Sequence, residues 1–544
     1  MKWLEGVIAA FPAGERFLNE KLIEHFASST KPRPHPFSLW GPTRPTEPAP
    51  VANPAPAAAF RSPPSPSAPS CYTSWPSLVD RTFTGRHLPP CREDRSYPEI
   101  DEVVGLLSRA GAMVPSERSS VLFCYFAQWF TDSFLRKHPL DPRRNTSNHE
   151  IDLCQIYGLD EPSTWALREG RDGRLKSRMA DGEEYPLLLY KDGELDPQFF
   201  DATKEVGLSF LRAGRAPLWE KAVNEQSEDA LKDPARRDYF HAAGLDRAGS
   251  TVAYSALNTI FLREHNRIAG ALARAYAGER GWDDDRLFET ARMVNIRQIL
   301  TVVVNDYIRH LGGVFPFTLD TTFAERQAWY RTNRISIEFN LLYRWHSLIP
   351  EELELGDGRT VDFHAYRFNN RLLEENGIEA IISAASTQKA GRYGLFNTPG
   401  FMRDAEVGGL TWARMFGVQP FNRYRERFGL DPYDGIEALT GGDLRAADAL
   451  KAVYGDDVDE VEFSIGLLAE GRGAGELMPE TTTRMVAYDA FTHILTNPLL
   501  AGAIHRPETF SDVGWDILQE NATLAQIVQR NVRRPEAVTV SLSA

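Results

Sequence analysis

Apolar positions recur at helical spacing through most of the chain, and this pattern predicts a mainly α-helical protein. Helices are expected over 99–110, 116–137, 251–274, 286–311, 331–346, 377–389 and 481–495. Strand signals are few and short, as at 187–190 and 538–541. No internal repeat is visible. We therefore expect one large domain of long helices joined by irregular loops.

The amino-terminal part has a different pattern and divides the chain into three segments. Residues 1–30 predict short amphipathic helices, one of which places Phe17, Leu18, Leu22, Ile23 and Phe26 on one face. That face either packs on the main domain or makes a monotopic membrane contact, and both readings stay open. Residues 31–70 are dense in Pro, Ala and Ser and predict an extended linker. The helical domain then spans 71–544.

Charge and hydropathy exclude several classes of protein. A net charge of −14 over 544 residues argues against a nucleic-acid partner and against a polybasic membrane patch. The first residues lack the apolar core of a signal peptide, and no apolar run is long enough for a transmembrane helix. Four scattered cysteines indicate neither a disulfide framework nor a zinc site. The simplest expectation is a cytoplasmic, intracellular protein, with or without peripheral membrane association.

Candidate chemistry centres on the stretch 333–346, which contains no Pro or Gly and can run as a helix toward Pro350. Tyr343 and His346 are three residues apart, which would put their side-chain roots ~5–6 Å apart on one face. Imidazole is an axial iron ligand and phenol is a one-electron donor. The spacing alone favours two satisfied core residues over a cofactor site.

A second helical pattern, 121–137, carries Gln128 and Asp132 on one face of an otherwise apolar stretch. Such side chains are either hydrogen-bonded to their surroundings or placed for chemistry. The run 263–267 is most simply a buried lattice of ion pairs and hydrogen bonds. His265 within it is the strongest rival to His346 as a metal ligand.

Residues 338–350 (EFNLLYRWHSLIP) resemble the catalytic helix of the cyclooxygenases, or prostaglandin H synthases, within the animal-type haem peroxidase superfamily. Further segments resembling the same family, in the same order, are 126–131, 148–158, 261–268, 419–433, 450–455 and 506–510. The resemblance implies the haem peroxidase fold and one haem b per chain, with His346 as the proximal iron ligand rather than His265. It also implies that Tyr343 carries a radical and that Trp345 lies beside the cofactor.

The resemblance places Gln128 and Asp132 on the distal side of the haem, where the family has Gln and His. The distal His moves a proton on bound peroxide, which is general acid–base work. A carboxylate with an unperturbed pKa of ~4 does this poorly near neutrality unless its surroundings raise that value. We therefore expect weakened peroxidase activity.

Around the substrate the family pattern is partly broken. Val314 stands where the family has a Tyr that helps to hold a carboxylate, and Ala490 stands where it has the Ser that aspirin acetylates. Ile308 and Leu311 match positions that line the fatty-acid channel, although both also suit a plain core. Lys31 or Arg33 could replace the missing carboxylate partner.

The expected function is haem-dependent dioxygenation of a polyunsaturated fatty acid by O2 through a Tyr343 radical, giving a hydroperoxide. Prostaglandin-type cyclisation is the less favoured outcome because the carboxylate clamp is altered. Two alternatives stay open: a haem peroxidase acting on small phenolic donors, and a non-catalytic haem-binding relative. A homodimer is implied by the resemblance alone.

Overall fold

A computed structural model describes residues 12–28, 80–91, 95–138, 143–201, 204, 206–211, 230, 232–312, 318–321, 323–330, 333–473 and 475–544. The linker 31–70, the first eleven residues and Val314 lie outside this part of the chain. Within it, helices dominate, and the strands form five small two-stranded sheets. The mainly α-helical fold class is therefore confirmed.

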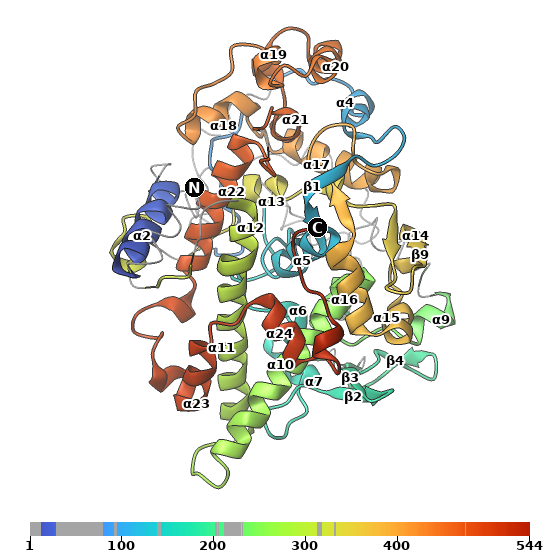
Figure 1. Cartoon of the computed structure of the whole chain (residues 1–544), viewed down its shortest axis with the longest axis vertical. Helices are drawn as coiled ribbons and strands as arrows, with labels where there is room; N and C mark the ends of the chain where they lie inside the picture. The colour runs from blue at the N-terminus through green and yellow to red at the C-terminus, as the bar shows by residue number, and fades with distance from the viewer. Residues whose placement is uncertain are drawn as a thin grey trace.

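Two long helices, α10 (Val252–Ala275) and α11 (Asp284–Val302), lie side by side through the molecule (Figure 1). Each begins at a side-chain cap: Thr251 accepts from the amide of Tyr254, and Asp283 from that of Arg286. α11 continues as a π-helical segment, η5 (Val303–Ile308), into α12 (Arg309–Gly312). The helices expected over 251–274 and 286–311 are confirmed, the second with this π segment near its end.

The helix α5 (Val121–Thr131) packs against α10 and α16 (Ile378–Thr387). The helix predicted over 116–137 is wrong at both ends. Residues 115–120 form strand β1, which pairs with β10 (Lys389–Gly391). Ser120 then caps α5 by accepting from the amide of Phe123, and Asp132 is the residue at its carboxyl end.

The continuous helix predicted over 331–346 is also wrong. Residues 333–336 are not helical, and α13 covers only Ile337–Leu342 before the chain turns into the 3-10 segment η7 (His346–Leu348). The indole N–H of Trp345 donates to the carbonyl of Leu342 at 2.8 Å. This side-chain bond satisfies a carbonyl at the end of α13, so the helix stops without Pro or Gly.

The amino-terminal helix α2 (Pro12–Ser28) packs on α22 (Glu480–Leu495), and the two lie together at one side in Figure 1. Phe26 stacks on Phe491 with ring centroids 6.4 Å apart. Ile23 is buried, but Phe17 is 62% exposed, so the predicted apolar face is only partly covered. Among the described residues, no helix combines the length and apolar character needed to cross a bilayer.

Shorter elements complete the fold. The helices are α4 (Ile100–Leu107), α6 (Cys154–Tyr157), α7 (Glu161–Leu167), α9 (Pro234–Arg237), α14 (Phe363–Tyr366), α15 (Asn370–Asn376), α17 (Arg403–Met415), α18 (Phe421–Arg427), α19 (Ile436–Leu439), α20 (Leu444–Tyr454), α21 (Phe463–Ala469), α23 (Pro507–Gln519) and α24 (Leu524–Arg530). The remaining strands are β2 (Ser177–Ala180), β3 (Glu183–Pro186), β4 (Tyr190–Lys191), β5 (Glu194–Leu195), β6 (Phe200–Asp201), β7 (Val206–Gly207), β8 (Glu352–Glu354) and β9 (Thr360–Asp362).

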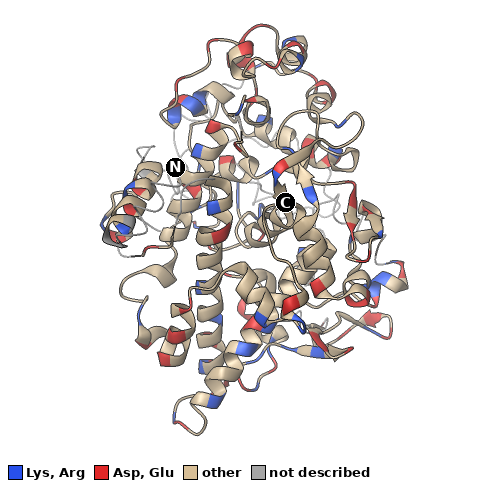
Figure 2. Cartoon of the chain, viewed as in Figure 1, with Lys and Arg blue, Asp and Glu red and all other residues tan. Residues whose placement is uncertain are grey.

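The two strands predicted from the sequence are wrong over most of their length. At 187–190 the chain forms an isolated bridge at Leu188, and Tyr190 opens β4; 538–541 is not a strand. Acidic and basic positions are spread over the whole molecule (Figure 2). The negative charge is therefore not gathered in one part of the fold.

Candidate functional site

His346 lies at the start of η7, directly after the break that ends α13. Its Nδ1 is 2.9 Å from Oε1 of Glu406, a buried residue of α17. A carboxylate oxygen accepts hydrogen bonds, so Nδ1 carries the proton and Nε2 keeps its lone pair. The side chain of His346 retains 18% exposure. This imidazole therefore has one ring nitrogen anchored by the protein and the other available as a ligand.

Arg344 fastens the same segment to α17. Its Nη1 donates to the carbonyl of Ala405 at 3.1 Å. Gly409 allows the approach, because a Cβ at that position would lie 3.1 Å from the guanidinium. Arg344, Glu406 and Gly409 also line an irregular cavity of about 370 Å³ beside α13. Consecutive residues of α17 thus hold Arg344 and His346, on either side of Trp345.

Tyr343 points into different surroundings. Its ring stacks on Trp345 with centroids 4.5 Å apart and meets the edge of Phe339 at 5.0 Å. Burial raises its pKa well above that of free tyrosine, and the charge of Asp489 acts in the same direction. The neighbouring Tyr307 likewise has a raised pKa, mainly from burial and then from Tyr343. Both phenols are therefore neutral, protonated groups at neutral pH.

Tyr343 and Tyr307 line a second, small cavity that is almost entirely apolar. Its other lining residues come from α5, η5, α13 and α22 and from the segments beside them: Phe130, Phe134, Ile151, Val303, Ile308, Phe339, Ala490, His493 and Ile494. The polar groups at its wall are the two phenols and one imidazole. Tyr343 therefore lies at the wall of an apolar cavity.

The predicted substrate residues divide around this cavity. Ile308 and Ala490 line it. Leu311, on α12, is not part of its wall but packs half-buried against the core. Val314 lies outside the described residues, as do Lys31 and Arg33. The role of each in substrate binding stays a prediction.

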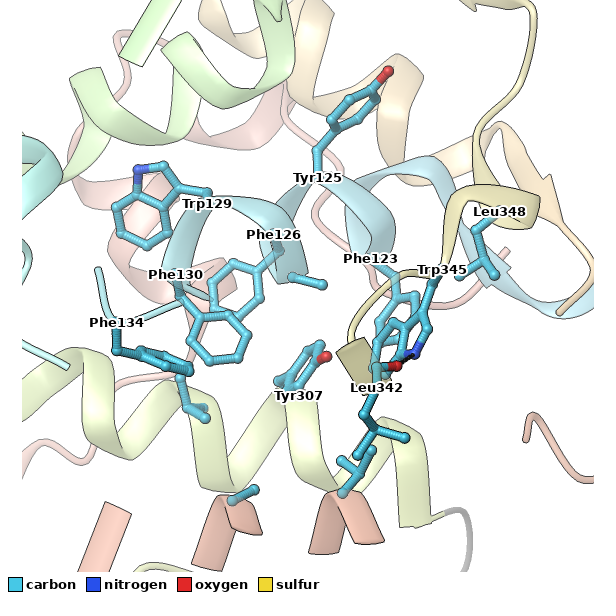
Figure 3. Packing of buried hydrophobic residues seen from close by; sticks show 14 of the residues in the cluster. Phe123, Tyr125, Phe126, Trp129, Phe130, Phe134, Tyr307, Leu342, Trp345 and Leu348 are labelled. Atoms are coloured by element: carbon cyan, nitrogen blue, oxygen red, sulfur yellow. Dashed lines mark hydrogen bonds between the residues drawn. The ribbon is translucent and has the colours of Figure 1, made fainter. Parts of the chain in front are cut away.

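The side chains of α5 separate into two groups (Figure 3). Phe126, Phe130 and Phe134 point from this part of the chain toward Tyr307. Tyr125 and Trp129 point the other way, and Phe123 stacks on Trp345 at 6.1 Å. One side of α5 therefore faces the apolar cavity, and its first turn touches the segment that holds His346.

Gln128 and Asp132 have polar partners rather than an apolar pocket. Gln128 Nε2 donates to Ser250 Oγ at 3.4 Å. The Asp132 carboxyl is 95% buried and lies 3.5 Å from Nη1 of Arg247, which precedes α10 in η4 (Asp246–Gly249). Burial raises the pKa of Asp132, while Arg247 and then Arg136 oppose that shift. The carboxyl thus has the raised pKa that proton transfer requires, although a guanidinium counteracts it.

His265, the rival ligand, uses both ring nitrogens inside the protein. Nε2 donates to the carbonyl of Gly173 and Nδ1 accepts from the hydroxyl of Tyr157, both at 2.9 Å. The residue is fully buried, and this burial lowers its pKa to about 3. Its neighbour Glu264 is held by Arg267 and Arg530. The prediction that 263–267 forms a structural lattice is confirmed.

Sequence reasoning missed four residues that the structure brings to these sites: Glu406, Tyr307, Arg247 and His493. Glu406 is sixty positions from His346 on a helix with an ordinary amphipathic pattern. Tyr307 lies one residue before Ile308, inside a run already expected to be helical. No spacing in the sequence marks either as a partner of the Tyr343–His346 segment.

Comparison with known proteins supports haem as the cofactor. A model of the family described as animal haem peroxidase matches residues 128–542. Mouse prostaglandin G/H synthase 1 is 30% identical over 488 residues, covering 87% of this chain and 74% of that protein. Horse prostaglandin G/H synthase 2 is 29% identical over 494 residues, with the same coverages.

Solved structures show the same fold at lower identity. Rice (Oryza sativa) fatty acid alpha-dioxygenase superposes with a TM-score of 0.65 at 18% identity, covering 85% of this chain and 83% of that chain. Peroxidase A from Dictyostelium discoideum gives a TM-score of 0.63 at 19% identity, with coverages of 85% and 94%. The expected haem peroxidase fold is thereby confirmed.

Proposed function

Since the chain belongs to the animal haem peroxidase family, we propose that this haem-dependent oxidoreductase oxygenates a polyunsaturated fatty acid through a radical on Tyr343. The observation that carries the proposal is the placement of Tyr343 at the wall of an apolar cavity, three residues before His346. The relatives named prostaglandin G/H synthase and the structural neighbour named fatty acid alpha-dioxygenase support a fatty acid as the substrate.

The residues present fit a haem. His346 offers Nε2 as an iron ligand because Glu406 occupies Nδ1. One haem b per chain would be held by this ligand, and Gln128, Asp132 and Trp345 would line its site. When bound, the haem supplies the one-electron oxidation that converts Tyr343 to a phenoxyl radical.

The residues of the chain position the substrate and exclude water from Tyr343. Tyr343 takes a hydrogen atom from an activated C–H of the acyl chain and becomes a phenol again. O2 adds to the carbon radical, and the resulting peroxyl group recovers a hydrogen atom from Tyr343 to give the hydroperoxide. Apolar walls such as Ile308 and Phe339 hold the acyl chain and exclude water.

Asp132 determines the peroxidase activity that we expect. Its raised pKa allows proton transfer, but the nearby Arg247 favours the ionised carboxylate that returns a proton poorly. We therefore propose weak peroxidase turnover beside the oxygenase reaction. Hydroperoxide formation without cyclisation, a cytoplasmic location, a homodimer and peripheral membrane contact through α2 belong to the same proposal; the exposed Phe17 supports the last of these.

The test is O2 uptake by haem-loaded protein with a polyunsaturated fatty acid, comparing Tyr343→Phe with Tyr366→Phe. Both tyrosines pack against the core, Tyr343 partly buried and Tyr366 fully buried, but Tyr366 bonds to Tyr125 on the other side of α5. We expect Tyr343→Phe to reduce uptake to background while keeping the Soret band, and Tyr366→Phe to retain uptake.

Other outcomes would replace the proposal. Oxidation of guaiacol that survives Tyr343→Phe, without fatty-acid oxygenation by the unaltered protein, would indicate a peroxidase of small phenolic donors. A normal Soret band that neither peroxide nor fatty acid changes would indicate a non-catalytic haem-binding relative.

A further inference from the structure

The contact between Glu406 and His346 joins two elements far apart in the chain. Oε1 of Glu406 lies 2.9 Å from Nδ1 of His346 and also accepts from Oγ1 of Thr398 at 3.5 Å. Glu406 is buried, with 7% of its side chain exposed. A buried carboxylate is costly unless it is hydrogen-bonded, so its position is fixed by the few groups that satisfy it.

Glu406 differs from the other buried glutamates that contact cations. Glu462 pairs with Arg414, Glu470 with Arg425, and Glu264 with Arg267 and Arg530. Within the described residues, the ion-pair partner of Glu406 is the imidazole of His346. A carboxylate paired with arginine is accounted for as structure, whereas the Glu406 carboxylate bonds the ring whose second nitrogen is the proposed iron ligand.

The geometry determines the state of the ring. A carboxylate can only accept, so the Nδ1 proton is directed at Glu406 and the Nε2 lone pair is directed away from α17. The hydrogen bond also draws positive charge out of the ring, which makes Nε2 a stronger electron donor. Arg344, bonded to Ala405, holds the backbone beside His346 so that the ring cannot easily turn.

We propose that Glu406 is the positioning residue of the proximal ligand, fixing the tautomer of His346 and strengthening its donation to the haem iron. The inference rests on the assignment of His346 as that ligand. A more strongly donating imidazole stabilises ferric over ferrous iron, so Glu406 lowers the reduction potential of the bound haem.

The first experiment compares Glu406→Gln with Asp404→Asn in haem-loaded full-length protein. Asp404 is on the same helix but exposed, so its variant matches the loss of one charge without touching His346. We expect Glu406→Gln to raise the Fe(III)/Fe(II) potential, to lower the iron–histidine stretching frequency of the ferrous form, and to weaken haem retention by about 10- to 100-fold. Asp404→Asn should leave all three unchanged.

A potential and stretching frequency that match those of the unaltered protein would overturn the proposal. So would equal shifts in the two variants. If the unaltered protein binds no haem, the proposed function fails instead, so the two failures are distinguishable.

A second measurement does not depend on the folding of Glu406→Gln. In His346→Gly, added imidazole can enter the space left by the ring and bind the haem iron. Glu406 should make imidazole bind more tightly than 1-methylimidazole, which has no N–H to donate, and Glu406→Ala in the same background should remove that preference. Equal binding of the two ligands in His346→Gly would contradict the proposal.

Discussion

Two histidines, the buried His265 and the partly exposed His346, differ in how the protein uses their ring nitrogens. His265 on α10 donates to Gly173 and accepts from Tyr157, so both nitrogens are satisfied inside the protein. Only Nδ1 of His346 has a partner among the described residues, Glu406, and 18% of the His346 side chain is exposed. The comparison teaches that His265 has no ring nitrogen left for a ligand, whereas Nε2 of His346 is still available for the proposed role.

The largest expected effect comes from His346→Ala. Haem binding should fall by more than the ~10- to 100-fold typical for losing an outer partner, because the ligand itself is removed. Absorption spectra of the haem-titrated protein measure it, with His364→Ala as the control because that histidine is exposed. Retention of a normal Soret band by His346→Ala would break the comparison.

His265→Ala should lower the stability of the fold and leave haem binding intact. Removing the ring leaves a cavity and deprives the Tyr157 hydroxyl and the Gly173 carbonyl of their partner, which should cost about 2–4 kcal/mol of unfolding free energy. Urea denaturation measures this loss, and the folded fraction should still bind haem. If that fraction bound none while keeping native circular dichroism, His265 would be more than structural.

The pH dependence of stability tests whether His265 is held neutral in the folded state. Burial lowers the pKa of His265 to about 3, whereas the unfolded chain takes up this proton at about 6.5. The unfolded state therefore gains the proton first, and His265 contributes stability above pH 6.5 that is lost progressively as the pH falls toward 3.

We expect this contribution to shrink by about 3 kcal/mol between pH 7 and pH 4. The measurement is the difference in unfolding free energy between the unaltered protein and His265→Gln, which has no proton to gain. A difference that stays constant over this range would show that the ring is not excluded from protonation in the fold.

Much of the fold could be predicted from the sequence because α10, α11, α16 and α22 bury one long apolar pattern each. The residues at which α5 begins and α13 ends could not be predicted. Period alone does not reveal that Ser120 caps α5 or that the Trp345 indole ends α13, because both effects depend on single side-chain hydrogen bonds.

For the site, the motif resemblance singled out Tyr343 and His346, and the structure places them beside a cavity and a carboxylate, respectively. Glu406 and Arg247 were not predictable, since each reaches its partner through tertiary packing. In the case of Asp132, sequence suggested that an apolar pocket would be needed to raise its pKa. The structure shows burial together with an arginine.

The early end of α13 separates two compartments. On an unbroken helix, the phenol at 343 and the imidazole at 346 would open onto one shared space. With the indole N–H of Trp345 closing the last turn, Tyr343 lines the apolar cavity and His346 bonds to Glu406 on α17. Under the proposed function, this break would direct the radical-bearing phenol and the iron-binding imidazole to different neighbours, although only two residues separate them in the chain.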